Sequence, residues 1–173
     1  LGTLGATTTF VLFYLMTVFA LGWATTGMAL ERADVLPVQL IGVLFFAALI
    51  PVAALLADKF GQIRVLMAAT IGIGLFGALF APLLHSGLTG LLIFFALGFA
   101  LMGCTYGPLG AAMARPFPTA VRYTGASMAF NLAGIVGASL APYIAVKLAG
   151  SWGPGAVGSY LSGAAVITAL ALW

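Results

Sequence analysis

Residues 36–57 read LPVQLIGVLFFAALIPVAALLA, an apolar run in which polar and apolar side chains do not alternate. A chain that crosses hydrocarbon can satisfy its backbone hydrogen bonds only as an α-helix or as a closed β-barrel. Barrel strands show a period of two, which this run lacks. About 20 apolar residues suffice for a helix to span a bilayer, so the run predicts a transmembrane helix.

The composition extends this prediction to the whole chain. Hydrophobic residues make up 64% of the sequence and charged residues 5%, whereas a soluble domain carries about 25% charged residues. So few charges could not coat a soluble globule, and we therefore expect an all-α membrane protein. The net charge of +3 is spread over the chain without a basic run, which gives no support for nucleic-acid binding. Cys104 is the single cysteine, and we expect neither a disulfide, a metal site nor a cofactor.

Charged residues and Gly/Pro clusters divide the chain into apolar segments, each near the length needed to span a bilayer. The breaks between them are short, so we expect a single six-helix bundle over residues 1–173. The first segment lacks the pattern of a signal peptide and is predicted to span. The predicted spans cover approximately residues 7–30, 37–57, 65–84, 88–113, 122–146 and 154–173.

Lysine and arginine residues indicate how the bundle is oriented. The second and fourth connections carry Lys59, Arg64, Arg115 and Arg122, whereas the other three connections together carry two basic residues. Positive loops remain in the cytoplasm, so we expect both termini and these two connections to be cytoplasmic.

A short motif lies in the second connection, Asp58-Lys59-Phe60-Gly61-Gln62-Ile63-Arg64. It resembles the D-[RK]-x-G-x-x-[RK] loop of the major facilitator superfamily, which joins the second and third helices of each six-helix half. The resemblance implies a cytoplasmic gating loop, to which we assign Asp58, Lys59, Gly61 and Arg64, together with Arg122 from the fourth connection.

A second motif is more specific. It comprises Tyr106-Gly107-Pro108-Leu109 and the stretch FPTAVRYTGAS over residues 117–127. Both resemble segments of the metabolite:proton symporter family of that superfamily, on either side of the loop between its tenth and eleventh helices. The family usually has an acid just before F-P-T, where this chain has Arg115-Pro116. The resemblance implies that the chain corresponds to helices seven to twelve, one half of a twelve-helix fold with a 3+3 inverted repeat.

The same resemblance implies the function. Such proteins carry a small polar metabolite, such as an organic acid, an amino-acid derivative or a betaine, together with protons by alternating access between two halves. The implied partners are the metabolite, protons, the lipid of a bacterial inner membrane and an N-terminal six-helix half. Glu31, Asp34 and Asp58 all fall at predicted helix ends. Proton relays use acids within the membrane, so we expect the titrating carboxylate in the other half.

Polar side chains inside the predicted spans are candidates for a substrate cavity. Asn131 lies about 13 Å into the fifth span by the helical rise, near the midplane. Its amide could bind substrate or bond to another helix, and serine and threonine hydroxyls could simply bond to their own helix. The candidates are Tyr14, Thr17, Trp23, Tyr106, Ser127 and Asn131.

A different class of function is a self-contained six-helix channel or structural bundle. An intramembrane serine hydrolase would require a base beside Ser127, and His85, the only histidine, is predicted at the opposite membrane face. We therefore do not expect an enzyme. The two half-helix signatures of an aquaporin-type channel are also absent from the sequence.

Overall fold

The computed structural model describes residues 2–173, and these form helices joined by short turns. The first rod is continuous and comprises α1 (Gly2–Tyr14), the π-helical turn η1 (Leu15–Phe19) and α2 (Ala20–Thr26). Three long helices follow, which are α3 (Arg32–Phe60), α4 (Gln62–Leu84) and α5 (Gly87–Ala114). After the short η2 (Thr119–Val121), a second composite rod contains α6 (Arg122–Ile135), η3 (Val136–Leu140) and α7 (Ala141–Trp152), and α8 (Pro154–Leu172) ends the chain.

Five of these helical stretches in the described residues are long and apolar enough to cross a membrane. They are Thr3–Thr26, Arg32–Phe60, Gln62–Leu84, Gly87–Ala114 and Pro154–Leu172. The all-helical membrane architecture is therefore confirmed. The stretch 122–152 runs alongside as a helix but is not among the five, so the predicted count of six spans is not confirmed.

Four predicted boundaries are wrong by four or more residues. The first helix begins at Gly2 instead of residue 7, and α3 begins at Arg32 instead of residue 37, because an acid such as Asp34 is favourable in the first turn of a helix. The first helix ends at Thr26 instead of residue 30, because Gly27 begins a turn in which Ala29 adopts a φ of 53°. The fifth helix continues beyond residue 146 to Trp152 and ends at Gly153, whose φ of 80° favours glycine. A single Lys147 does not stop a helix, since its long side chain can reach the membrane interface.

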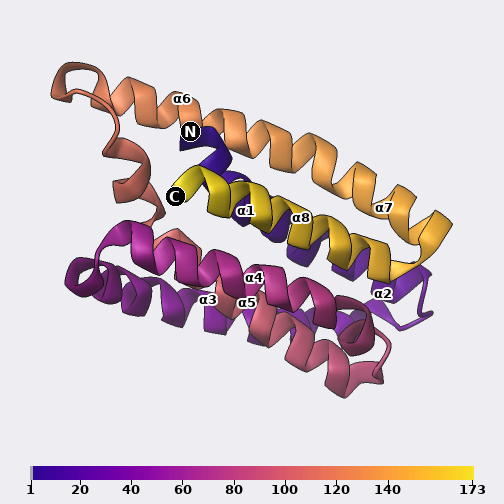
Figure 1. Ribbon diagram of the computed structural model, residues 1–173. Helices are drawn as coiled ribbons and strands as arrows, with labels where there is room; N and C mark the ends of the chain where they lie inside the picture. The colour runs from indigo at the N-terminus through magenta and orange to yellow at the C-terminus, as the bar shows by residue number, and fades with distance from the viewer. Residues whose placement is uncertain (1) are drawn as a thin grey trace.

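The helices are arranged in three layers (Figure 1). The composite rod α6 to α7 lies on one side, α1 and α8 lie in the middle, and α3, α4 and α5 lie on the other side. The most extensive helix pairs are α3 with α5 and α4 with α8, and α1 contacts α8, α6 and α5. Of the most apolar stretch of the first rod 61% is buried, against 17% of the most apolar stretch of α3, so the first rod forms the centre of the bundle and α3 its edge.

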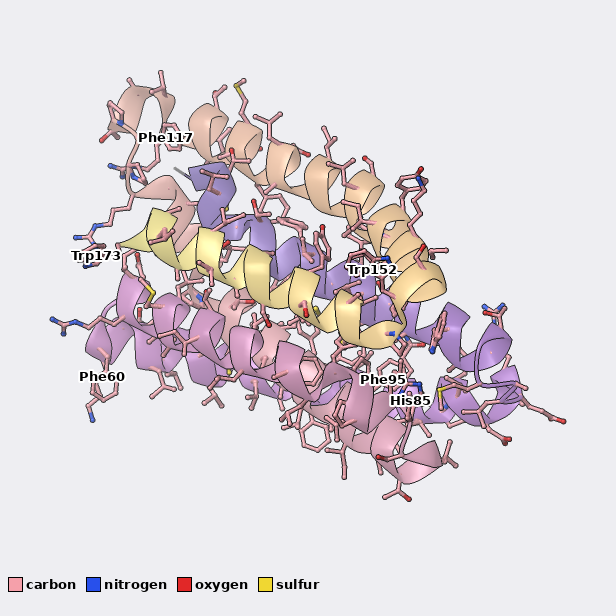
Figure 2. All side chains as sticks on the ribbon, turned by 45° about the vertical axis from the view of Figure 1, so that its right-hand side comes forward. Phe60, His85, Phe95, Phe117, Trp152 and Trp173 are labelled. Atoms are coloured by element: carbon pink, nitrogen blue, oxygen red, sulfur yellow. The ribbon has the colours of Figure 1, made fainter. Side chains whose placement is uncertain are left out.

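Both chain termini lie at the same end of the bundle (Figure 1). Phe60, Phe117 and Trp173 also lie at this end, whereas His85 and Trp152 lie at the opposite end (Figure 2). This grouping agrees with the alternation of connections that the basic residues predict.

Helices α4 and α8 pack closely because small residues let their backbones approach each other. A Cβ atom added to Gly158 would overlap the carbonyl oxygen of Gly77, and a Cβ on Gly77 would overlap the Ser162 hydroxyl. Ser162 also donates a hydrogen bond of 2.8 Å to the Gly74 carbonyl. In lipid, helix association depends on such small-residue packing and interhelical hydrogen bonds, because lipid tails are as apolar as the side chains.

A buried hydroxyl network fixes α1 to α8. Thr8 Oγ1 donates to Thr168 Oγ1 over 2.8 Å, and Thr168 Oγ1 donates to the Leu4 carbonyl over 2.7 Å. Thr8 and Thr168 are both almost completely buried, so these bonds satisfy groups that lipid could not solvate.

Candidate functional site

A hollow of about 620 Å³ lies between the last turns of α5 and the first turns of α6. It brings together three of the predicted residues, Arg122, Ser127 and Asn131. From α5 it is lined by Gly110, Met113 and Ala114, and from the η2–α6 segment it is also lined by Thr119, Tyr123, Ala126 and Phe130.

Asn131 is exposed in this hollow. Its Nδ2 donates a hydrogen bond of 2.8 Å to the Ser127 carbonyl one turn earlier. Within residues 2–173 no hydrogen bond is made by its amide oxygen, which is therefore available to accept one from outside this chain. Polar side chains within a bilayer are costly to leave in lipid and usually face water, protein or a ligand.

Aromatic rings connect the hollow to the interior of the bundle. Phe130, at the hollow, packs edge-on against Phe10 of α1 with ring centroids 4.9 Å apart. Phe10 in turn contacts Tyr106 at 6.4 Å, and Tyr106 contacts Phe46 of α3 at 5.3 Å. The predicted residue Tyr106 is thus half-buried among α1, α3 and α5 and does not itself line the hollow.

The candidates of the first rod do not line this hollow. Tyr14 is half-buried beside Phe13, and Thr17 Oγ1 donates to the Phe13 carbonyl over 2.7 Å. Trp23 stacks on Phe19 with ring centroids 6.0 Å apart. The indole Nε1 of Trp23 is buried without a hydrogen-bond partner among the described residues. A buried donor of this kind is uncommon, because nearly all buried polar groups are paired. A cavity role for Tyr14, Thr17 and Trp23 stays a prediction.

Gln39 of α3 is a polar residue that sequence reasoning missed. Its Nε2 donates to the Met16 carbonyl over 3.1 Å and lies 3.5 Å from the Thr17 carbonyl, both within η1. A π-helical turn leaves carbonyls outside the regular α-helical pattern, and such turns are frequent at functional sites. The signal that could have found Gln39 is an isolated amide within an otherwise apolar run.

The residues of the predicted gating loop lie on two different sides of α3. Asp58 and Gly61 line a hollow of about 480 Å³ together with Arg122 and with Arg115, the residue that stands where the family usually has an acid. Arg122 Nε also donates to the Phe117 carbonyl over 3.2 Å. Gly61 has a φ of 95°, a conformation that favours glycine, which explains why the turn between α3 and α4 carries this residue.

Lys59 and Arg64 do not line the hollow that contains Asp58. The Lys59 ammonium lies 5.3 Å from the centre of the Phe60 ring, and Arg64 lines a separate groove. The structure thus brings Asp58, Gly61 and Arg122 together and leaves the other two predicted residues apart from them.

A serine hydrolase is inconsistent with this geometry. Ser127 lies near the start of α6, whereas His85 lies at the opposite end of the bundle (Figure 2), where its Nδ1 is 3.0 Å from the Ala81 carbonyl. The polar groups that line the hollow between α5 and α6 are an amide, hydroxyls and a guanidinium group. They can bind and orient a polar molecule, but they do not supply a nucleophile with an adjacent base.

Comparisons with known proteins identify metabolite transporters. The chain is 48% identical over 179 residues to the inner membrane metabolite transport protein YhjE of Escherichia coli and 38% identical over 184 residues to a putative metabolite transport protein of Haemophilus influenzae. It is 32% identical over 167 residues to the shikimate transporter of Escherichia coli. These alignments cover 99%, 99% and 91% of the chain.

The chain spans about 40% of the length of these curated relatives, since the alignments cover 40%, 42% and 37% of them. No protein-family model and no solved structure matches the chain. The relatives are named as transport proteins and not as enzymes, which confirms the expectation from the sequence.

Proposed function

Because the chain belongs to the metabolite transport proteins of the major facilitator type, we propose that it forms one six-helix half of a proton-coupled symporter. In this proposal the hollow between α5 and α6 is one wall of the substrate pathway. An N-terminal half supplies the other wall, and the two halves rock about a midplane site. Substrate and proton binding then shift the populations of inward-open and outward-open states.

This proposal rests on a difference in polarity between the exposed faces of α4 and α8 and the exposed face of α6. The exposed side of α4 carries Ile71, Leu75 and Leu79, and the exposed side of α8 carries Ile167 and Leu170. These aliphatic faces suit lipid.

By contrast, α6 exposes Thr124 and Asn131 beside the half-buried Ser127, in addition to the apolar Met128, Leu132 and Ile135. Polar groups inside a membrane face the bundle interior or a water-filled cavity, because hydrocarbon cannot hydrogen-bond them. The α6 face is therefore the one that we assign to the pathway and to the contact with the other half.

Two further features support a small polar metabolite as the substrate. The hollow combines an amide at Asn131 with a guanidinium at Arg122, so it offers hydrogen bonds and one positive charge to an anionic group. One relative is named for its transport of shikimate. A hydroxylated organic acid of that kind suits these groups.

Proton coupling would depend on the other half. Glu31 precedes the first residue of α3, Asp34 lies in the first turn of α3 and Asp58 in its last turn, so all three acids of the chain lie at helix ends. A carboxylate that titrates during transport usually lies deeper in the membrane. Asp58, together with Arg115 and Arg122, instead suits a cytoplasmic contact that holds one conformation closed.

The test uses Asn131→Leu in the intact protein. Labelled shikimate is the first probe, followed by a panel of small organic acids. Loss of one hydrogen bond to substrate should weaken binding by about 1 kcal/mol, or about fivefold. Met128→Leu, an exposed apolar change one turn away, is the matched control. Unchanged affinity together with a lower melting temperature would assign Asn131 to packing, and uptake that persists after the proton gradient is collapsed would remove the proton coupling.

A further inference from the structure

A second groove lies on a different part of the bundle, where α3, α4 and α5 meet. It has a volume of about 510 Å³. Its walls are mostly aliphatic or small side chains, with one guanidinium and one thiol. The lining residues are Leu56, Phe60, Arg64, Val65, Ala68, Ala69, Leu101 and Cys104.

The groove runs from the end of the bundle into its apolar part. Arg64 and Phe60 stand on either side of the Gly61 turn and form the mouth. A Cβ atom on Gly72 would lie 2.8 Å from Leu101 Cδ2, which places Leu101 at the level of Gly72. Along α4 the lining residues run from Arg64 to Ala69, over which the α-helical rise gives roughly 8 Å. One leaflet of a bilayer with a hydrocarbon core of about 30 Å measures roughly 15 Å, so the groove extends about halfway into one leaflet.

The mouth of the groove is positively charged. Arg64 lines it, and Lys59 lies next to it over the Phe60 ring. No acid is found among the described residues that line it, and the nearby Asp58 lines the other hollow, with Arg115 and Arg122. The Arg64 charge is therefore not neutralised by an acid of the groove itself.

The surroundings of the groove suit lipid instead of a protein partner. Further along α4, the exposed positions carry Ile71, Leu75 and Leu79. The polar exposed face that we assign to the other half lies on α6, in a different layer of the bundle (Figure 1). An apolar groove within a bilayer that opens on a cationic side chain complements an acyl chain attached to an anionic headgroup.

We propose that this groove binds an anionic phospholipid. The phosphate lies against the Arg64 guanidinium, with Lys59 adding to the attraction. One acyl chain lies along Val65 and Ala68 toward Leu101 and passes the Cys104 thiol. The site is separate from the substrate pathway, so a lipid bound here would stabilise the packing of α3, α4 and α5 without competing with the metabolite.

Cys104 offers a direct readout, because a lipid chain in the groove would shield its thiol. The intact protein, with any cysteine other than Cys104 replaced by serine, is purified in detergent and labelled with N-ethylmaleimide at increasing mole fractions of phosphatidylglycerol or phosphatidylcholine. We expect phosphatidylglycerol to slow labelling at a lower mole fraction than phosphatidylcholine does. In Arg64→Gln, the mole fraction of phosphatidylglycerol that halves the labelling rate should be about fivefold higher. This is the contribution typical of one basic residue at an anionic surface.

Two further variants complete the design. Arg115→Gln removes a charge at the same end of the bundle but outside the groove, and should leave the protection by phosphatidylglycerol unchanged. Ala68→Phe fills the groove, and the lipid-dependent part of the protection should disappear. Equal protection by the two lipids, or a normal response of Arg64→Gln, would overturn the proposal. Equal protection by millimolar inorganic phosphate alone would also overturn it, because the ligand would then be a free anion.

Discussion

The contact between α4 and α8 can be tested with a single methyl group. In Gly158→Ala the new Cβ would overlap the Gly77 carbonyl oxygen and lie 2.9 Å from Phe80 Cβ. Phe80 is fully buried, and a backbone carbonyl cannot turn away as a flexible side chain can. The two helices must therefore separate. Overpacking in a well-packed core costs about 1–3 kcal/mol, and a clash with backbone belongs at the upper end of that range.

Gly163→Ala on the same helix is the matched control, because a Cβ there meets no atom within 4 Å. It removes a helical glycine at no steric cost and should gain up to about 1 kcal/mol. Gly158→Ala gains the same helix propensity, so the two variants should differ by the steric cost alone, about 1–3 kcal/mol in the free energy of unfolding, measured by thermal or denaturant unfolding of the intact protein in detergent. Equal stability of the two variants would refute the crossing of α4 and α8 at Gly77 and Gly158.

Three further changes test other parts of the structure. Thr168→Val should lower the free energy of unfolding by about 1–3 kcal/mol, because it leaves buried partners without their hydroxyl, whereas Thr168→Ser should be close to wild type; equal loss in both would argue against the network. Asp58→Asn should slow turnover with substrate affinity unchanged, and normal transport at normal expression would remove its gating role. An impermeant thiol reagent should label Lys59→Cys only from the cytoplasm and His85→Cys only from outside, and the reverse pattern would invert the proposed orientation.

Much of the fold follows from where charge and glycine interrupt apolar runs. The turn between α3 and α4 illustrates this, since Gly61 has the positive φ that its place in the motif suggests. Trp152 and Trp173 are 82% and 99% exposed and lie at opposite ends of the bundle, where membrane interfaces favour tryptophan (Figure 2). These features depend on residues that are close together in the sequence, so a single sequence is enough to predict them.

Features that depend on how helices face one another were not predictable in the same way. The π-helical turn η1 contains neither glycine nor proline, the residues at which bending is ordinarily expected. Gln39 reaches this turn from a different helix, and the separation of Arg64 from Asp58 depends on the rotation of α3 against α4. Sequence spacing places a residue along its own helix, but the identity of its neighbour depends on tertiary packing.

The central claim is that the exposed face of α6 borders an aqueous pathway, whereas the exposed face of α8 meets lipid. It is tested most directly with single-cysteine variants Asn131→Cys and Ile167→Cys of the intact protein in membranes, in which Cys104 and any cysteine outside residues 1–173 are replaced by serine. A charged thiol reagent enters hydrocarbon only at a cost of several kcal/mol, so Asn131→Cys should react at least about tenfold faster than Ile167→Cys. Equally slow reaction at both positions would contradict the assignment of α6 to the transport pathway.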